Sequence, residues 1–241
     1  MNDCLPKDQL IDVLLQTAAL KFGHFQTKSG RNSPYFFDTS MLYTGKTWFE
    51  CTKYLVNLSL DRWHKDQVSG AFGAAYKGIP LSVAFSQLWH QHTHCHIPFA
   101  FCRKETKPHG EGGNIVGHAA ALATTPPHHN AENHNTKNHN KGVLLLDDVL
   151  TSGKSLRHSY NILKEHHIPV LGCVVLIDRS EKDLHQTTIS AKQACQDLMN
   201  VPIISAINIH DVLAYLKRHK SQVTHQHREA IQTYLLDYGT G

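Results

Sequence analysis

The chain has 241 residues, of which 41% are hydrophobic and 18% are charged, and its formal net charge is +4. This length suits one large domain, and no apolar run reaches the roughly 20 residues that cross a bilayer. The start of the chain lacks a signal-peptide pattern, the modest charge does not indicate a nucleic-acid partner, and the six cysteines form no CxxC pair, so we expect a reduced cytoplasmic protein without membrane or nucleic-acid contacts.

The first part of the chain alternates helical and extended patterns. Apolar residues at helical spacing predict a helix over 8–22 that ends at Gly23. A strand and turn over 25–31 and an extended segment over 33–38 follow. A second amphipathic helix is expected over 46–63.

Two glycines, Gly73 and Gly78, bracket a predicted turn from a strand into a helix over 79–90. Glycine allows the backbone to approach a charged ligand closely, and a helix N-terminus favours an anion. The alternating histidines from 90 to 96 could bind a metal in an extended segment. A surface turn is the simpler interpretation, because no partners that would orient metal-bound imidazoles are evident.

A strand over 97–102 leads into a segment that combines cations with glycines. Arg103, Lys104, Lys107 and His109 precede three glycines. Taken alone, such a run is usually a solvated loop. Beside a phosphate site it would instead close over a polyanion, because positive groups stabilise the charge that develops on departing pyrophosphate.

Residues 119–141 differ from the rest of the chain in composition, being polar and rich in histidine and asparagine. They lack the apolar residues needed to form a core, which predicts a disordered insertion between two strands. A zinc or nickel site is the less favoured alternative, because no fixed spacing of ligands is visible.

The most informative stretch spans residues 143–155. Its apolar start predicts a strand buried on both faces of a parallel sheet, and Asp147 and Asp148 then precede a small polar turn that opens a helix. A P-loop would require glycine at the position of Asp148. Ligands of open α/β sheets bind at the carboxyl ends of strands, and a helix N-terminus attracts phosphate. The stretch therefore combines two carboxylates, which could bind hydroxyl groups or a metal ion, with a neighbouring turn that could bind one phosphate.

The remaining chain continues this alternation, with a helix over 153–166, strands over 170–177 and 201–207, and a helix from 209. Arg179 follows the first of these strands. An arginine there is often part of a surface ion pair, but its planar fork also suits a substrate carboxylate. Strands alternating with helices predict an α/β fold with a mainly parallel sheet flanked by helices.

Five of these segments resemble the signatures of one family. The two acids followed by Thr-Ser-Gly-x-Ser resemble the phosphoribosyl diphosphate motif of the type I phosphoribosyltransferases. The other four resemble signatures of the orotate phosphoribosyltransferases and occur in that family's order. They are Phe-x-x-Lys-Ser-Gly-Arg-x-Ser-Pro-Tyr-Phe-Phe from Phe25, Ala-Tyr-Lys-Gly-Ile from Ala75, Arg-Lys-Glu-x-Lys-x-His-Gly-Glu-Gly-Gly from Arg103, and Asp-Arg at 178–179. The second of these is preceded by Ala74, where the family commonly has proline.

The resemblance implies a fold and an activity. The fold would be a type I phosphoribosyltransferase core in one domain over 1–241, with residues 1–62 forming a hood and dimer contacts. The reaction would join orotate to phosphoribosyl diphosphate with Mg²⁺, giving orotidine 5′-monophosphate and pyrophosphate in pyrimidine biosynthesis. The family works as a homodimer, so the 103–113 loop would reach into the partner's pocket.

The resemblance also implies roles for particular residues. The catalytic residues would be Lys104, Lys107, His109, Asp147 and Asp148, with Mg²⁺ held mainly through substrate. Among the substrate-binding residues, Lys28 would act from the hood, and Phe36 and Phe37 would line the pocket for the orotate base. Arg179 and Thr151 would bind the carboxylate of orotate, and Tyr76, Lys77 and Arg103 would lie near pyrophosphate. The 5′-phosphate would be surrounded by Val149, Leu150, Thr151, Ser152, Gly153, Lys154 and Ser155.

Two other functions stay open at this point. A purine phosphoribosyltransferase would share the acids and the phosphate turn but would not need an arginine for a carboxylate. A ligand-sensing regulator that binds nucleic acid would be expected to show a basic face and no catalytic loop.

Overall fold

The computed structural model describes residues 7–27, 30–103, 114–123, 141–219 and 222–240. Its main sheet contains β3 (Val68–Gly73), β4 (Phe99–Cys102), β5 (Ile115–Val116), β6 (Gly142–Leu150), β7 (Val170–Asp178) and β8 (Ile203–Asn208). These six strands lie in the order β5-β4-β3-β6-β7-β8. Only β5 runs antiparallel to its neighbour among these strands, which confirms the mainly parallel sheet.

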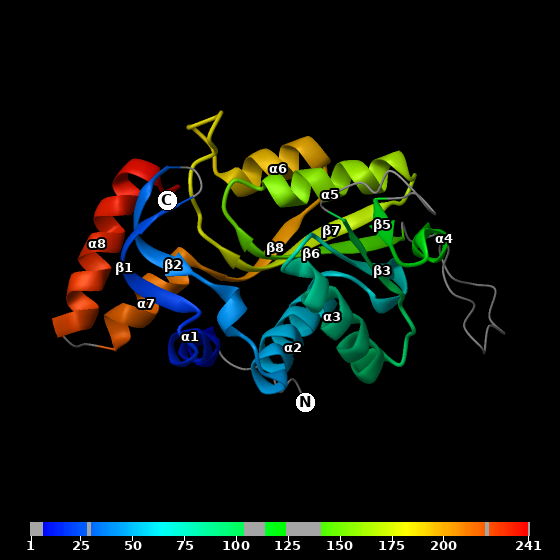
Figure 1. The fold of residues 1–241 in the computed structure, drawn as a ribbon, viewed down its shortest axis with the longest axis horizontal. Helices are drawn as coiled ribbons and strands as arrows, with labels where there is room; N and C mark the ends of the chain where they lie inside the picture. The colour runs from blue at the N-terminus through cyan, green and yellow to red at the C-terminus, as the bar shows by residue number, and fades with distance from the viewer. Residues whose placement is uncertain (1–6, 28–29, 104–113, 124–140, 220–221, 241) are drawn as a thin grey trace.

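Helices cover both faces of this sheet (Figure 1). One face carries α2 (Gly45–Arg62) and α3 (Gly78–Thr93), and the other carries α5 (Lys154–Glu165) and α6 (Ala191–Met199). Strand β6 shows why its sequence is an unbroken apolar run: Leu144 and Leu146 pack into the core beneath α2 and α3, whereas Val143 and Leu145 pack into the core beneath α5 and α6. A strand buried on both faces has no polar side.

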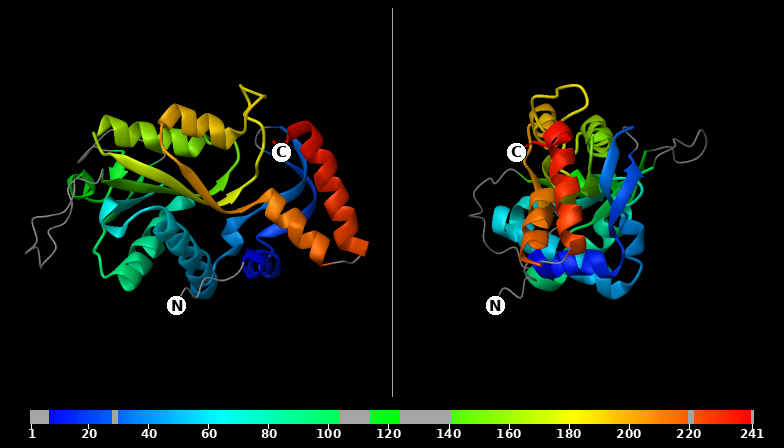
Figure 2. Two further views of the ribbon diagram at one scale, coloured as in Figure 1. Left: turned by 180° about the vertical axis from the view of Figure 1, so that it is seen from behind. Right: turned by 90° about the vertical axis from the view of Figure 1, so that its left-hand side faces the viewer.

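A second group of elements lies at one end of the main sheet (Figures 1 and 2). We call it the hairpin unit; it contains α1 (Lys7–Gln16), the antiparallel strands β1 (Leu20–Gln26) and β2 (Asn32–Phe37), α7 (Ile209–Arg218) and α8 (Gln222–Tyr238). The N-terminal and C-terminal parts of the chain meet here: Lys7 Nζ lies 2.8 Å from Asp211 Oδ1, and the rings of Tyr35 and Tyr234 meet edge to face at 5.7 Å. A 3₁₀ turn, η1 (Thr39–Met41), follows β2 and leads to α2.

Two predicted helices have different ends in the structure. The helix expected over 8–22 stops at Gln16, because Thr17 and Ala18 form a turn in which Ala18 takes a φ of +56°. Leu20 then pairs with Phe37 in the hairpin, so tertiary pairing overrides the helical pattern. The helix expected over 79–90 continues to Thr93, so Gln91, His92 and Thr93 are helical rather than part of a surface turn.

The boundaries of the insertion and the hood also differ from the prediction. Residues 119–123 form the short helix α4 rather than a disordered segment. Leu122 is fully buried there, and Ser69 Oγ donates to its carbonyl at 2.9 Å; residues 124–140 lie outside the described part of the chain. Helix α2, assigned to the hood by sequence, packs on the main sheet instead. In the part of the chain that the structure describes, no helix has the length and apolar character needed to cross a membrane.

Candidate active site

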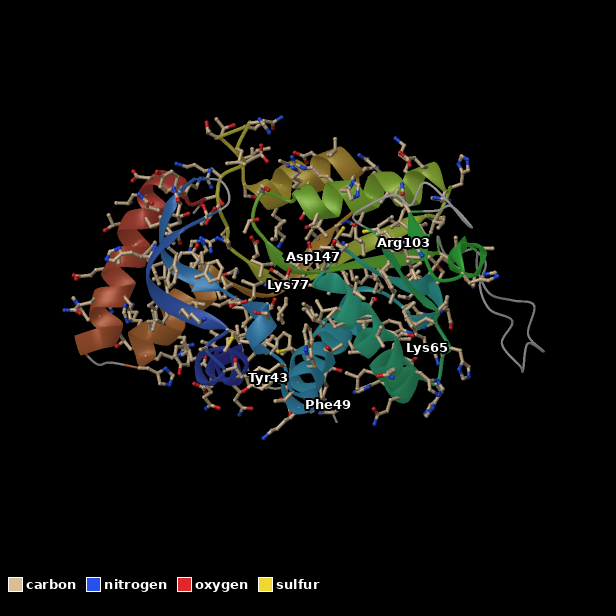
Figure 3. All side chains as sticks on the ribbon, viewed as in Figure 1. Tyr43, Phe49, Lys65, Lys77, Arg103 and Asp147 are labelled. Carbon is tan, nitrogen blue, oxygen red and sulfur yellow. The ribbon has the colours of Figure 1, made fainter. Side chains whose placement is uncertain are left out.

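The candidate site lies where the order of strands reverses. From β3 the chain moves outward to β4 on one side, and from β6 it moves outward to β7 and β8 on the other. The carboxyl ends of parallel strands open a crevice at such a switch point. Lys77 follows β3 and Asp147 lies near the end of β6, and Figure 3 shows the two labelled side chains close together at the centre of the molecule.

The two acids lie within β6, which continues to Leu150, rather than after the strand as predicted. Because successive strand residues point to opposite faces, each acid has its own partners. Asp147 accepts hydrogen bonds from Ser155 Oγ on α5 and from the backbone N–H of Asp148 at 2.9 Å. Asp148 accepts one from Thr39 Oγ1. Both acids are buried, so the polypeptide fixes their orientation before any ligand binds.

Burial, and then the negative charge of Asp148, raise the pKa of Asp147 well above its ordinary value. Hydrogen bonds from Ser155 and from the Asp148 N–H oppose this shift. Two carboxyl groups that lie close together in a buried site attract a nearby positive charge. The pair is therefore suited to stabilise a developing cation or to hold hydroxyl groups.

Lys77 supplies the nearest cation to these acids in the described residues. Its Nζ lies 3.7 Å from Asp148 Oδ2 and 3.6 Å from Asp38 Oδ1. A hydrogen bond from Ser40 lowers the pKa of Asp38; partial burial opposes this and the charge of Lys77 adds to it. The Lys77 side chain is 44% exposed, so it can contact an anionic ligand from solvent while resting between two carboxylates.

The turn that carries Lys77 needs both of its glycines. A Cβ on Gly73 would overlap the carbonyl of Gly78, and a Cβ on Gly78 would overlap the carbonyl oxygen of Leu146. The backbone N–H of Ala74 donates to the same Leu146 oxygen at 2.9 Å. The close approach predicted from these glycines is confirmed, but the neighbour is the backbone of β6. This contact places Lys77 beside the acids.

The turn from β6 into α5 is exposed to solvent on one side and packed against α6 on the other. Gly153 begins α5 with a φ of +70°, and a Cβ there would overlap Cys195 Sγ. Thr151 and Lys154 are exposed, whereas Gly153 is buried. Exposed N–H groups at the N-terminus of a helix form an anion site. The geometry fits the expected pocket for a phosphate.

Arg179 belongs to a buried cluster rather than to a surface ion pair. Its Nε donates to Glu181 Oε1 at 2.6 Å, its Nη2 donates to Ser33 Oγ at 2.9 Å, and its guanidinium carbon lies 4.2 Å from the centre of the Tyr35 ring. Only 2% of the residue is exposed. The guanidinium is therefore held by partners on the hairpin and on the segment after β7.

The other predicted residues fall into three groups. Lys28, Lys104, Lys107 and His109 lie outside the described residues. Arg103 bonds through its N–H to the carbonyl of Asn114 at 2.8 Å and lies toward β5 and α4 in Figure 3, away from Lys77. Tyr76, Ser152 and Val149 are at least partly exposed, whereas Leu150 is buried in the core.

Phe36 and Phe37 do not share one surface, because they are adjacent residues of β2. Phe37 is buried in the core and meets Tyr35 at 5.7 Å, edge to face. Phe36 is half-buried and stacks on Phe25 at 5.4 Å. Only Phe36 is therefore placed to offer an open aromatic face to a ligand.

Sequence reasoning missed the turn η1 as part of the site. Asp38 holds Lys77, and Thr39 holds Asp148 although it is 109 residues away in sequence. The polar run that follows Tyr35-Phe36-Phe37 was the available signal. Its partners depend on how the hairpin meets the main sheet, and periodicity carries no information on that contact.

The donor set fits Mg²⁺ delivered with a substrate. No group of three or more His, Cys, Asp or Glu side chains that could hold a metal occurs in the described ranges. Mg²⁺ takes oxygen ligands, keeps several waters, and is usually bound by one or two carboxylates together with substrate phosphates. Asp38, Asp147 and Asp148 provide such oxygens beside the proposed phosphate sites.

Comparison with known proteins agrees with this geometry. Residues 44–198 match the family model described as the phosphoribosyl transferase domain. A solved orotate phosphoribosyltransferase from Francisella tularensis is 31% identical, with a TM-score of 0.73 over 96% of this chain and 100% of the other. Fold and site together define the class of type I phosphoribosyltransferases, and the predicted fold class is confirmed.

Curated relatives narrow the class further. An orotate phosphoribosyltransferase from Chromohalobacter salexigens is 33% identical over 240 residues, covering 96% of this chain and 94% of the relative. One from Buchnera aphidicola is 34% identical over 219 residues, covering 91% and 92%. The chain belongs to the orotate phosphoribosyltransferase family, which confirms the resemblance found in its motifs.

Proposed function

We propose that the chain transfers the phosphoribosyl group of phosphoribosyl diphosphate to orotate, releasing pyrophosphate and orotidine 5′-monophosphate in pyrimidine biosynthesis. The observation that carries this proposal is the placement of Asp147 and Asp148 at the switch point of the sheet, beside both Lys77 and the phosphate turn. Membership of the family supports the choice of orotate over a purine base.

The 5′-phosphate would bind at the Thr151–Ser155 turn, where backbone N–H groups at the start of α5 face an anion. Its position would place the ribose over the end of β6. Asp147 and Asp148 would then hold the ribose hydroxyls and stabilise the positive charge that develops at the anomeric carbon. No covalent nucleophile is required, because orientation and charge stabilisation suffice.

The departing pyrophosphate would meet cations from two segments. Lys77 would contribute from the β3–α3 turn, and Arg103, Lys104, Lys107 and His109 from the loop after β4. Mg²⁺, carried by the diphosphate and supported by the site carboxylates, would offset negative charge on the leaving group. Lys77 lies between Asp38 and Asp148, so these acids would keep it within reach of pyrophosphate.

Orotate would bind between the hairpin unit and the end of β7. Its carboxylate would bind the guanidinium of Arg179, because a guanidinium fork can donate two parallel hydrogen bonds to a carboxylate. Thr151 and Lys28 would add donors, and Phe36 would provide the aromatic surface. We further propose a cytoplasmic homodimer in which the 103–113 loop completes the partner's site.

A panel of bases tests the choice of substrate. The protein is incubated with phosphoribosyl diphosphate, Mg²⁺ and one of orotate, uracil, hypoxanthine or adenine, and loss of each base is followed by absorbance. Rapid loss of orotate alone is expected. Faster consumption of a purine would contradict the proposal in favour of a purine enzyme, and loss of no base would contradict the enzymatic assignment altogether.

A further inference from the structure

Glu181 is a buried carboxylate that accepts hydrogen bonds from side chains of different elements. Arg179 Nε and the Tyr234 hydroxyl donate to Oε1 at 2.6 and 2.8 Å, and Arg31 Nη1 donates to Oε2 at 2.9 Å. Its side chain is 3% exposed, and that of Arg31 is 12% exposed. One negative group thus lies between two guanidinium groups that come from different parts of the chain.

The count of charges in this cluster has a consequence for Arg179. Arg31 and Arg179 are positive and Glu181 is negative, so the cluster has one positive charge in excess. The nearby acid Asp178 has its own cation, with Lys192 Nζ 3.9 Å away. Without Arg31, Glu181 would neutralise Arg179. With Arg31 in place, Arg179 retains attraction for a further anion, and buried charges interact strongly because little water screens them.

Arg31 is also held firmly in place. Its Nη2 donates to the carbonyl of Lys182 at 3.1 Å, and its guanidinium carbon lies 5.0 Å from the centre of the Tyr238 ring on α8. Its backbone carbonyl accepts the N–H of Thr27 at 2.9 Å and so closes the hairpin turn. Arg31 therefore connects the turn of the hairpin, through its backbone, with the segment after β7 and α8, through its side chain.

We propose that Arg31 is a positioning residue that determines specificity for a carboxylated base, because it offsets the charge of Glu181 and leaves Arg179 with a positive charge for the ligand. This inference rests on the proposed function, in which Arg179 binds the carboxylate of orotate. Arg31 acts through Glu181 and does not itself contact the substrate.

Three variants separate the charge from the packing. Arg31→Met removes the excess charge, and the KM for orotate should rise by about tenfold while the KM for phosphoribosyl diphosphate changes by less than about twofold. Arg31→Lys keeps the charge and should recover most of the affinity for orotate. In the double variant Arg31→Met with Glu181→Gln, Arg179 is again the unbalanced charge, so the KM for orotate should fall back toward the wild-type value.

A matched control removes a similar ion pair elsewhere. Arg157 Nη2 lies 2.8 Å from Asp183 Oδ2, and Arg157 Nε lies 3.3 Å from Cys195 Sγ, next to the phosphate turn rather than to Arg179. Arg157→Met should lower Tm about as much as Arg31→Met and should leave the KM for orotate unchanged, with any effect on binding confined to phosphoribosyl diphosphate. Circular dichroism and melting curves of every variant establish that the folded proteins are being compared.

The outcomes distinguish the inference from the function on which it rests. A double variant that binds orotate no better than Arg31→Met would show that Arg31 acts only as a clamp, and this would overturn the charge argument. If Arg179→Met weakens orotate binding but Arg31→Met does not, the inference fails and the proposed function stands. If Arg179→Met leaves the KM for orotate unchanged, the placement of the substrate carboxylate is itself wrong.

Discussion

The hydroxyl of Thr39 donates a hydrogen bond to the carboxylate of Asp148, which joins the end of the hairpin to the central strand of the main sheet. Both residues are buried, with Thr39 only 1% exposed. This bond links the hairpin unit to an acid of the proposed site, so the hairpin unit helps to define how that acid is oriented.

Thr39→Val should reduce both stability and kcat. The variant keeps the shape of the side chain but leaves a buried carboxylate without its donor, at a cost of about 1–3 kcal/mol. Urea unfolding and steady-state kinetics measure the two effects. Ser40→Ala is the matched control, because Ser40 is exposed and bonds to Asp38 instead. Equal effects of the two variants would show that the Thr39 bond has no special role.

Asp147→Asn should abolish most of the activity while raising Tm at neutral pH. The pKa of Asp147 is raised in the folded protein from its ordinary value of 3.8, so the folded state binds more protons than the unfolded state above that value. Stability associated with this group is therefore complete below pH 3.8 and is lost as pH rises through the higher folded pKa.

The difference in Tm between Asp147→Asn and the wild type should accordingly grow as the pH is raised from about 4 toward neutrality. Melting curves across this range, with circular dichroism to check the fold, provide the measurement. A variant whose Tm lies below that of the wild type at neutral pH, and falls further below it as pH rises, would contradict the assignment of a buried, destabilising carboxylate.

Gly153→Ala should destabilise the protein by more than the roughly 1–2 kcal/mol that a left-handed backbone costs an alanine. The added Cβ also overlaps Cys195 Sγ, and the resulting shift of the turn should raise the KM for phosphoribosyl diphosphate. Adding Cys195→Ala removes the overlap but not the backbone strain. A double-mutant cycle should therefore recover part of the loss, and an additive result would exclude the steric explanation.

Mixing two inactive variants tests whether the site is shared between subunits. Lys107→Ala lies in the loop outside the described residues, and Asp147→Ala lies in the pocket. If the loop acts on the partner's site, a mixed dimer has one intact site, and random mixing should restore up to about a quarter of wild-type activity. Mixed dimers that remain inactive would show that the loop acts within its own subunit.

The local sequence predicts β6 and the turn after it well, because the residue types there are compatible with only one kind of local structure. The apolar run over 143–146 fits a strand covered on both faces, and Gly153 fits a turn with positive φ. The acids between them could be recognised because burying two adjacent carboxylates costs free energy, so their presence next to a buried apolar run indicates a function.

The contacts that complete the site could not be predicted in the same way. Thr39 meets Asp148, Arg31 meets Glu181, and Tyr234 meets Glu181 across 109, 150 and 53 residues of sequence. Each depends on how the hairpin and α8 pack against the end of the sheet. Periodicity describes only which face of an element is buried, so it gives no partner for a polar side chain at such a junction.

Direct measurement of the products tests the central claim, that this chain forms orotidine 5′-monophosphate at the acids of β6. The wild type and the Asp147→Asn, Asp148→Asn double variant are incubated with orotate, phosphoribosyl diphosphate and Mg²⁺, and both products are quantified by chromatography. The wild type should form orotidine 5′-monophosphate and pyrophosphate in equal amounts, and the folded double variant should form almost none. Absence of the nucleotide with the wild type, or undiminished formation by the double variant, would contradict the account.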